Sequence, residues 1–106
     1  MPEYDLKPMS LSPTQTRYLR GLAHDLKPVI LTGNKGITDA VLKEFAIALD
    51  HHELVKVKLG CDDRIERKRQ IAELRLHGNA ELVQSIGKVA SFYRRNDEQP
   101  KLALPK

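Results

Sequence analysis

The chain has 106 residues, of which 41% are hydrophobic and 30% charged, with one cysteine and a net charge of +4 at neutral pH. These values predict a single globular domain that needs no disulfide and lies in the reducing cytoplasm. They argue against a membrane protein, because no apolar run approaches the ~20 residues that cross a bilayer. We also expect no signal peptide, since the N-terminus lacks a basic stretch followed by an apolar one.

The positive charge is concentrated in two segments. Residues 12–36 hold four basic side chains against one acidic, and residues 79–95 hold three against one. A local excess of this kind indicates an anionic partner.

The first predicted element is a helix. Residues 1–11 carry two prolines and no hydrophobic period, so we expect a flexible leader before it. Ser12 can cap the helix, with Pro13 in the first helical position and Gln15 completing a capping box. The helix should end near His24, because a proline follows shortly after.

A strand and a second helix are predicted next, joined by a glycine loop. Residues 29–31 are fully apolar, which is typical of a buried strand. The loop Gly33-Asn34-Lys35-Gly36 follows, and Thr38 can cap the second helix. The core face of that helix is expected to be Val41, Leu42, Phe45, Ala46 and Leu49.

Residues 54–59 alternate at period two and predict another strand. The side chains of Val55, Val57 and Leu59 should face the helices. Lys56 and Lys58 should point to the other side of the sheet.

A third, charged helix is predicted over residues 63–77, with Gly78 just beyond its end. Its expected apolar anchors are Ile65, Ile71, Ala72 and Leu76.

Residues 81–86 and 88–94 predict a hairpin that reverses at Gly87. Residues 96–106 read as a C-terminal tail. The order α-β-α-β-α-β-β predicts a small α/β domain over residues 12–95, with a mixed four-stranded sheet.

The glycine loop is the first candidate binding site. Two glycines allow backbone amides to approach a phosphate closely, and Lys35 adds a mobile positive charge. The following helix contributes the unpaired N–H groups of its first turn. The alternative is a purely structural turn between strand and helix.

Basic side chains are the second candidate. We expect Arg17, Arg20, Lys27 and Lys35 to converge on one end of the domain and to form a phosphate-binding surface there. Lys56 and Lys58 could belong to it or serve only solubility. Tyr93, before Arg94 and Arg95, is a candidate stacking contact.

Catalysis has little support in the sequence. Cys61 lacks the spaced partners of a zinc site and any evident base, and the adjacent His51 and His52 point in different directions. We therefore expect no enzyme, no metal and no cofactor.

Two stretches of the sequence carry a family resemblance: LRGLAHDLKPVILTGNKGITDAVLKEFAIALDHHELVKVKL and VQSIGKVASFYRR. In combining LKP, GxxG, HHELVKVK and IGK-x4-YR, the chain closely resembles the CRM domain (chloroplast RNA splicing and ribosome maturation), in its single-domain bacterial YhbY form. The resemblance covers residues 10–95 and continues into the tail.

The resemblance implies a fold like the C-terminal domain of translation initiation factor 3 with one extra N-terminal helix. It also implies RNA-binding residues at Arg17, Arg20, Lys27, Gly33, Asn34, Lys35, Gly36, Lys56, Lys58, Lys88, Arg94 and Arg95. The chain departs from the family in its longer leader and its unusually basic third helix.

The sequence as a whole favours a non-catalytic, monomeric RNA-binding protein. The resemblance implies that it acts in assembly of the large ribosomal subunit by binding structured precursor rRNA in pre-50S particles. Two alternatives stay open: a module that docks on ribosomal proteins or assembly factors through the third helix, and a small RNA-processing enzyme. We expect no small-molecule substrate.

Overall fold

The computed structural model describes residues 11–105, and its helices and strands follow the predicted order. The predicted leader lies outside the described residues except for Leu11. The elements are α2 (Pro13–His24), β1 (Ile30–Leu31), α3 (Asp39–His52), β2 (Leu54–Lys58), α4 (Arg64–Gly78), β3 (Glu81–Ile86) and β4 (Val89–Tyr93).

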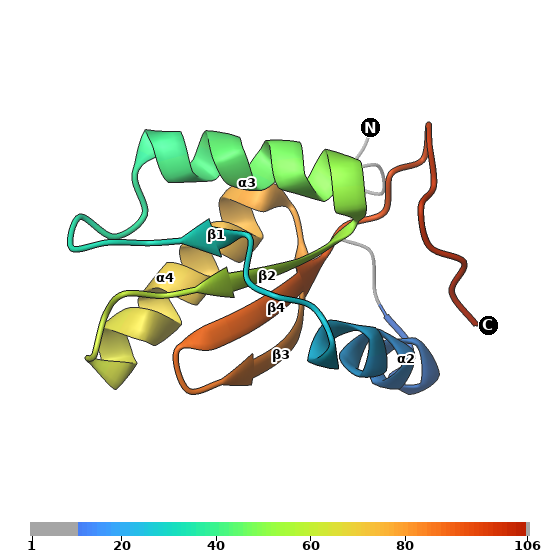
Figure 1. Cartoon of the computed structure of the whole chain (residues 1–106), viewed down its shortest axis with the longest axis horizontal. Coiled ribbons are helices and arrows are strands. Elements are labelled where there is room, and N and C mark those ends of the chain that lie inside the picture. Colours follow the sequence, from blue (N-terminus) through green and yellow to red (C-terminus); the bar gives the residue numbers. More distant parts are fainter. Residues whose placement is uncertain (1–10, 106) are drawn as a thin grey trace, which may run out of the picture.

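The four strands form one mixed sheet in the order β1-β2-β4-β3 (Figure 1). β1 runs parallel to β2, and β4 pairs antiparallel with both β2 and β3. The β3–β4 hairpin reverses at Gly87, whose φ of 57° lies in the left-handed region that favours glycine. The expected α/β fold with a mixed four-stranded sheet is confirmed.

Helices cover both faces of this sheet. On one face α3 and α4 pack against β2 and β4, and the rings of Phe45 and Phe92 meet edge to face with centroids 5.1 Å apart. On the other face α2 buries Leu19 and Ala23 against Leu54 and other residues at one end of the sheet. The rest of that second face is left uncovered by the helices (Figure 1).

Side chains along β2 alternate between the two faces of the sheet. Val55, Val57 and Leu59 join the core under α3 and α4, as predicted. Lys56 and Lys58 point to the opposite face, beyond the part that α2 covers.

Each described helix begins at a side-chain cap. Ser12 and Gln15 form the predicted capping box at the start of α2. Thr38 accepts a hydrogen bond from the backbone N–H of Val41, and Asp63 caps α4. These caps satisfy N–H groups that have no partner within the helix, which is why the predicted starts are correct.

The predicted core face of α4 was correct at Ile71, which packs against the core, and wrong at the other anchors. Ile65 and Leu76 are 78% and 77% exposed, while Gln70, Leu74 and Gly78 are buried. Gly78 is the last residue of the helix rather than the residue after it. Glycine is required there because a Cβ would lie 2.5 Å from the Phe45 ring. Asn79 takes the left-handed position instead, with φ 50°.

The prediction of a buried strand at residues 29–31 was also wrong. The strand has two residues, and Ile30 alone is buried, whereas Val29 and Leu31 are 54% and 68% exposed. β1 is an edge strand with α3 on one face only, so alternate side chains emerge into solvent.

The segment after β4 packs back on the domain. The buried carboxylate of Glu53 accepts backbone hydrogen bonds from Asn96, Lys101 and Leu102. Leu102 then packs against the cluster under α2, and the Gln15 side chain donates to the Pro105 carbonyl at 2.9 Å. None of the described helices is both long and apolar enough to span a membrane.

Candidate nucleic-acid interface

The glycine loop projects from the end of the sheet where β1 and β2 finish (Figure 1). The backbone N–H of Gly36 donates to the Gly33 carbonyl at 3.0 Å and closes a turn. Asn34 and Lys35 occupy its tip with exposed side chains. A turn of this kind presents its tip amides and the Lys35 ammonium to solvent, where an anion can reach them.

The two glycines of the loop have different structural roles. Gly36 has φ 70°, and a Cβ there would approach the Gln70 amide nitrogen to 3.2 Å, so the fold itself requires glycine. A Cβ on Gly33 would meet no atom within 4 Å. Within the described residues nothing demands glycine at position 33, and the space beside it is open to a ligand.

The loop rests against the segment that joins β2 to α4. The backbone N–H of Gly60 donates to the Thr32 hydroxyl at 2.9 Å and joins the two segments. Behind the loop lies a hollow of about 480 Å³, walled by residues 60–62 and by Glu66, Arg69 and Gln70 of α4.

Acidic groups near the loop are held in ion pairs. Arg69 bonds to both Glu66 and Glu73, and together with the Gln70 amide it lowers the pKa of Glu66 to about 2. Lys88 pairs with Asp62 and lowers the pKa of that carboxyl. These carboxylates are therefore partly neutralised.

Unpaired positive charge gathers at the same end. Lys35 and Lys58 form no ion pair within residues 11–105. Lys58 closes β2 opposite Leu31 and Val89, on the uncovered face of the sheet. Of the predicted site, the structure thus brings together Gly33, Asn34, Lys35, Gly36, Lys58 and Lys88.

Arg17 and Arg20 lie elsewhere, so the expectation that they converge with Lys35 was wrong. α2 packs on Leu54, at the start of β2, whereas the glycine loop adjoins the end of β2 (Figure 1). The strand separates the two by roughly 13 Å at about 3.3 Å per residue. Arg20 also donates to the Val83 carbonyl at 3.3 Å, which ties it to β3.

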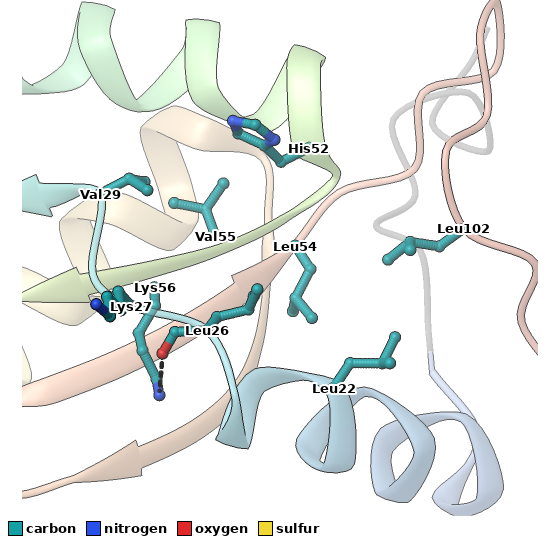
Figure 2. A pocket seen from close by; sticks show the side chains of 9 residues that line it. All are labelled: Leu22, Leu26, Lys27, Val29, His52, Leu54, Val55, Lys56 and Leu102. Carbon is teal, nitrogen blue, oxygen red and sulfur yellow. Dashed lines mark hydrogen bonds between the residues drawn. The ribbon is translucent and has the colours of Figure 1, made fainter.

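Lys27 and Lys56 border an apolar groove between α2 and the sheet (Figure 2). Leucine and valine side chains form its walls, with Leu102 contributed by the C-terminal segment. The Lys56 ammonium donates to the Leu26 carbonyl at 3.0 Å, shown as a dashed line in Figure 2. Lys56 therefore helps to hold the segment that leaves α2, in addition to carrying charge.

Arg94 is engaged in the fold. Its guanidinium donates to the carbonyls of Gly78 and Ala46 and to the Asp50 carboxylate, at 2.8, 3.2 and 2.8 Å. It joins the end of β4 to both α3 and α4, while Arg95 is exposed. Tyr93 is buried in the cluster under α2, and burial raises its pKa, so its ring is not placed for stacking.

This difference gives a test on adjacent residues. Arg94→Ala should lower the free energy of unfolding by about 2 kcal/mol, because it removes the hydrogen bonds to two helix carbonyls and the ion pair with Asp50. Arg95→Ala should change it by less than about 0.5 kcal/mol, as for an exposed side chain. Urea denaturation of the two variants measures both values. Equal stabilities would contradict the structural role of Arg94.

Cations of α4 were left out of the predicted site, although the sequence marked this helix as unusually basic. Residues 62–69 hold four basic and three acidic side chains, so the net charge of the segment is only +1 and does not reveal the cations. Helical spacing was the available signal: Arg64, Arg67 and Lys68 share one side of the helix, and Glu66 and Glu73 share another. The structure places these cations next to the β3–β4 hairpin.

This end of the molecule presents groups that can bind an anion rather than a metal. Cys61 is half-buried, and its sulfur lies 3.7 Å from the Asp63 carbonyl oxygen. Across residues 11–105, no group of three or more potential metal ligands is gathered. Exposed amides and unpaired cations are what the surface offers to a ligand.

Comparison with known proteins identifies the family of the chain. Residues 11–94 match the model of the CRS1/YhbY (CRM) domain. A probable RNA-binding protein of Pseudomonas aeruginosa, PA4753, is 41% identical over 93 residues, covering 88% of this chain and 89% of its own. An RNA-binding protein of Haemophilus influenzae is 41% identical over 97 residues, covering 92% and 97%.

A solved structure extends the likeness to three dimensions. The solution structure of the hypothetical protein SAV1595 from Staphylococcus aureus superimposes with a TM-score of 0.78 at 33% identity. The match covers 91% of this chain and all of that one. Because the family match spans every described helix and strand, the chain belongs to the CRS1/YhbY (CRM) domain family.

Proposed function

We propose that this protein binds structured RNA without catalysis, chiefly through phosphates at the glycine loop. The relatives from Pseudomonas, Haemophilus and Bacillus subtilis bear the names of RNA-binding or probable RNA-binding proteins. The observation that carries the proposal is the open space beside Gly33, next to the unpaired ammonium of Lys35. Phosphate contacts position a nucleic acid without reading its sequence, so specificity would come from RNA shape.

The loop amides, rather than the first turn of α3, are the proposed anchor. The Thr38 side chain already accepts a bond from the N–H of Val41, and Asp39 adds a negative charge to that turn. At the loop tip, the N–H groups of Asn34 and Lys35 donate to no protein acceptor in the described part of the chain. A phosphate would therefore meet these tip amides first.

The biological setting we propose is assembly of the large ribosomal subunit in the cytoplasm. This follows the resemblance to single-domain bacterial YhbY proteins, and the RNA partner would be precursor rRNA in pre-50S particles. Crosslinking in cells, followed by sequencing of the bound RNA, should recover large-subunit precursor rRNA. Recovery of unrelated RNAs alone would contradict this setting.

The loop variants give the most direct binding test. Lys35→Glu should weaken binding to a large-subunit rRNA transcript roughly tenfold and reduce the salt dependence by about one ion. Gly33→Ala should also weaken it, by roughly threefold or more, because its methyl group occupies the space proposed for the phosphate. Both should unfold like the wild type, since neither change meets a neighbour in the fold.

Gly21→Ala is the matched control for the added methyl group. A Cβ at Gly21 likewise meets no atom within 4 Å, but this residue lies on α2, away from the loop. The control should keep wild-type affinity while gaining about 0.5–1 kcal/mol of stability from helix propensity. Unchanged RNA affinity in Gly33→Ala and Lys35→Glu would remove the loop from the interface.

A protein-docking role for α4 remains the second candidate, favoured by one observation. The exposed side chains of Ile65, Ala72 and Leu76 form an apolar stripe on the side of the helix that faces away from the core. Association with large-subunit precursors that survives RNase digestion would support docking on protein. Loss of association after digestion would support RNA. Metal-dependent RNA cleavage, which we expect to be absent, would indicate an enzyme.

A further inference from the structure

Helix α4 separates its charges onto two sides. Glu66, Arg69 and Glu73 bond to one another on the side that faces the glycine loop. Arg64, Arg67 and Lys68 lie at spacings of three and four residues on the other side, toward the β3–β4 hairpin. Since the acidic side chains are paired with Arg69, the cations of the second side are not neutralised by their own helix.

A groove of about 470 Å³ runs between these cations and the hairpin. Besides the three basic side chains, it is lined by half-buried Ile71, by Ser85 and by Gly87 at the hairpin reversal. The lining contains no carboxylate. A groove with cations on one wall and a hydroxyl and a glycine backbone on the other matches the hydrogen-bonding needs of a phosphate.

Arg67 is held in place before any ligand arrives. Its Nη1 donates to the Cys61 and Asp62 carbonyls at 3.2 and 2.8 Å, and its side chain is half-buried. Nε and Nη2 form no hydrogen bond to the described residues and stay available. A guanidinium fixed in this way loses little side-chain entropy when it binds a phosphate, which favours binding.

The remaining cations of the groove are free of acidic partners. Arg64 and Lys68 are exposed and form no ion pair within residues 11–105. Two carboxylates precede Arg64 in the sequence, and each has another partner. Asp63 caps α4, and Asp62 pairs with Lys88 in the turn of the hairpin. The charges of Arg64 and Lys68 are thus directed to solvent rather than balanced by an ion pair.

We propose that the groove between α4 and the β3–β4 hairpin binds the RNA backbone at a second position, separate from the glycine loop. The proposal rests on the proposed function, since it assigns a further part of the same RNA to this chain. The glycine loop and the groove lie on opposite sides of α4, and a helix with its side chains is about 10 Å across. The two sites therefore hold different phosphates and together orient a folded RNA on the protein.

The test is a paired charge reversal in the groove. Arg64→Glu/Lys68→Glu should weaken binding to a large-subunit rRNA transcript at least tenfold and reduce the slope of affinity against salt by about two ions. Lys43→Glu/Lys101→Glu is the control, because it changes net charge equally at exposed lysines on α3 and in the C-terminal segment. The control should lose less than about threefold in RNA affinity, because its reduced net charge weakens only the long-range attraction to RNA. Thermal unfolding should be unchanged in both.

The outcomes separate this proposal from the broader function. If the groove variant binds like the control while Lys35→Glu still loses affinity, the groove is not an RNA site and the proposed function stands. If the wild type shows no salt-dependent RNA binding, the proposed function fails and the groove proposal with it. A groove variant that retains RNA affinity but loses RNase-resistant association with large-subunit precursors would overturn the proposal, because the occupant would be a protein.

Discussion

Replacing Glu53 by alanine is expected to lower the free energy of unfolding by about 4 kcal/mol, the largest effect of any single change considered for this protein. The Glu53 carboxylate is fully buried at the end of α3 and accepts three backbone hydrogen bonds. Their donors are Asn96, Lys101 and Leu102, at 2.6, 2.8 and 2.7 Å. Hydrogen bonds to a charged acceptor contribute about 1.5–3 kcal/mol each, and release of the segment into water recovers part of the loss.

The Glu53 position also has unusual backbone geometry. Its φ is 62°, a value that residues other than glycine and asparagine rarely adopt. Backbone hydrogen bonds to Leu49 and Arg94 and the carboxylate contacts together hold the residue there. Loss of the carboxylate should free the C-terminal segment as well as destabilise the domain. Amide hydrogen exchange should therefore accelerate most at Lys101 and Leu102.

Two companion variants make the Glu53 result interpretable. Glu53→Gln keeps one accepting oxygen but replaces the other by an NH₂ group, which cannot accept a hydrogen bond from a backbone N–H. We therefore expect about half of the destabilisation, roughly 2 kcal/mol. Glu44→Ala removes an exposed carboxylate from the same helix and should cost less than about 0.5 kcal/mol. Guanidinium denaturation measures all three. A Glu53→Ala variant as stable as Glu44→Ala would show that the segment does not depend on this carboxylate.

The second large effect is expected at Gly60. A Cβ on this residue would lie 2.4 Å from the Thr32 carbonyl oxygen and 3.4 Å from the Gly33 Cα. Both are backbone atoms, so the clash cannot be relieved by a side-chain rotation. Gly60→Ala should lower the free energy of unfolding by about 3 kcal/mol, at the upper end for overpacking.

The same change should also weaken RNA binding, because the atoms displaced are those that deliver the glycine loop. The hydrogen bond from Gly60 N–H to the Thr32 hydroxyl would be lost as the two segments separate. Gly33→Ala is the contrasting variant, since its methyl group meets no atom and stability should stay within about 0.5 kcal/mol. Thermal unfolding and an RNA titration on each variant distinguish support of the loop from contact with RNA. Wild-type stability in Gly60→Ala would contradict the supporting role.

Local sequence signals predicted several elements correctly, for reasons confined to neighbouring residues. Ser12, Pro13 and Gln15 specify the start of α2 through hydrogen bonds that span three residues. Alternation along β2 separates Val55 and Val57 from the lysines because a strand turns successive side chains to opposite faces.

Predictions failed where a residue's environment came from a distant segment. Gly78 looked like the residue after a helix, but the Phe45 ring packs against it and requires the missing Cβ. Gln70 is buried although it is polar, and its side-chain Nε2 donates a hydrogen bond to the Glu66 carboxylate. These residues recur at helical spacing with Leu74, but a search for apolar side chains passes over a glutamine and a glycine, and it selected the exposed Ile65 and Leu76 instead.

The candidate site shows the same division. The sequence by itself determined the family, the order of elements and a glycine loop between β1 and α3 with Lys35 at its tip. Only the tertiary structure decided which cations lie near that loop and which lie elsewhere. It placed α2 at the opposite end of β2, engaged Arg94 in the fold and brought Arg64 and Lys68 beside the hairpin. Charge is a property of single residues, but a binding surface depends on which of them the packing of the sheet and helices leaves exposed together.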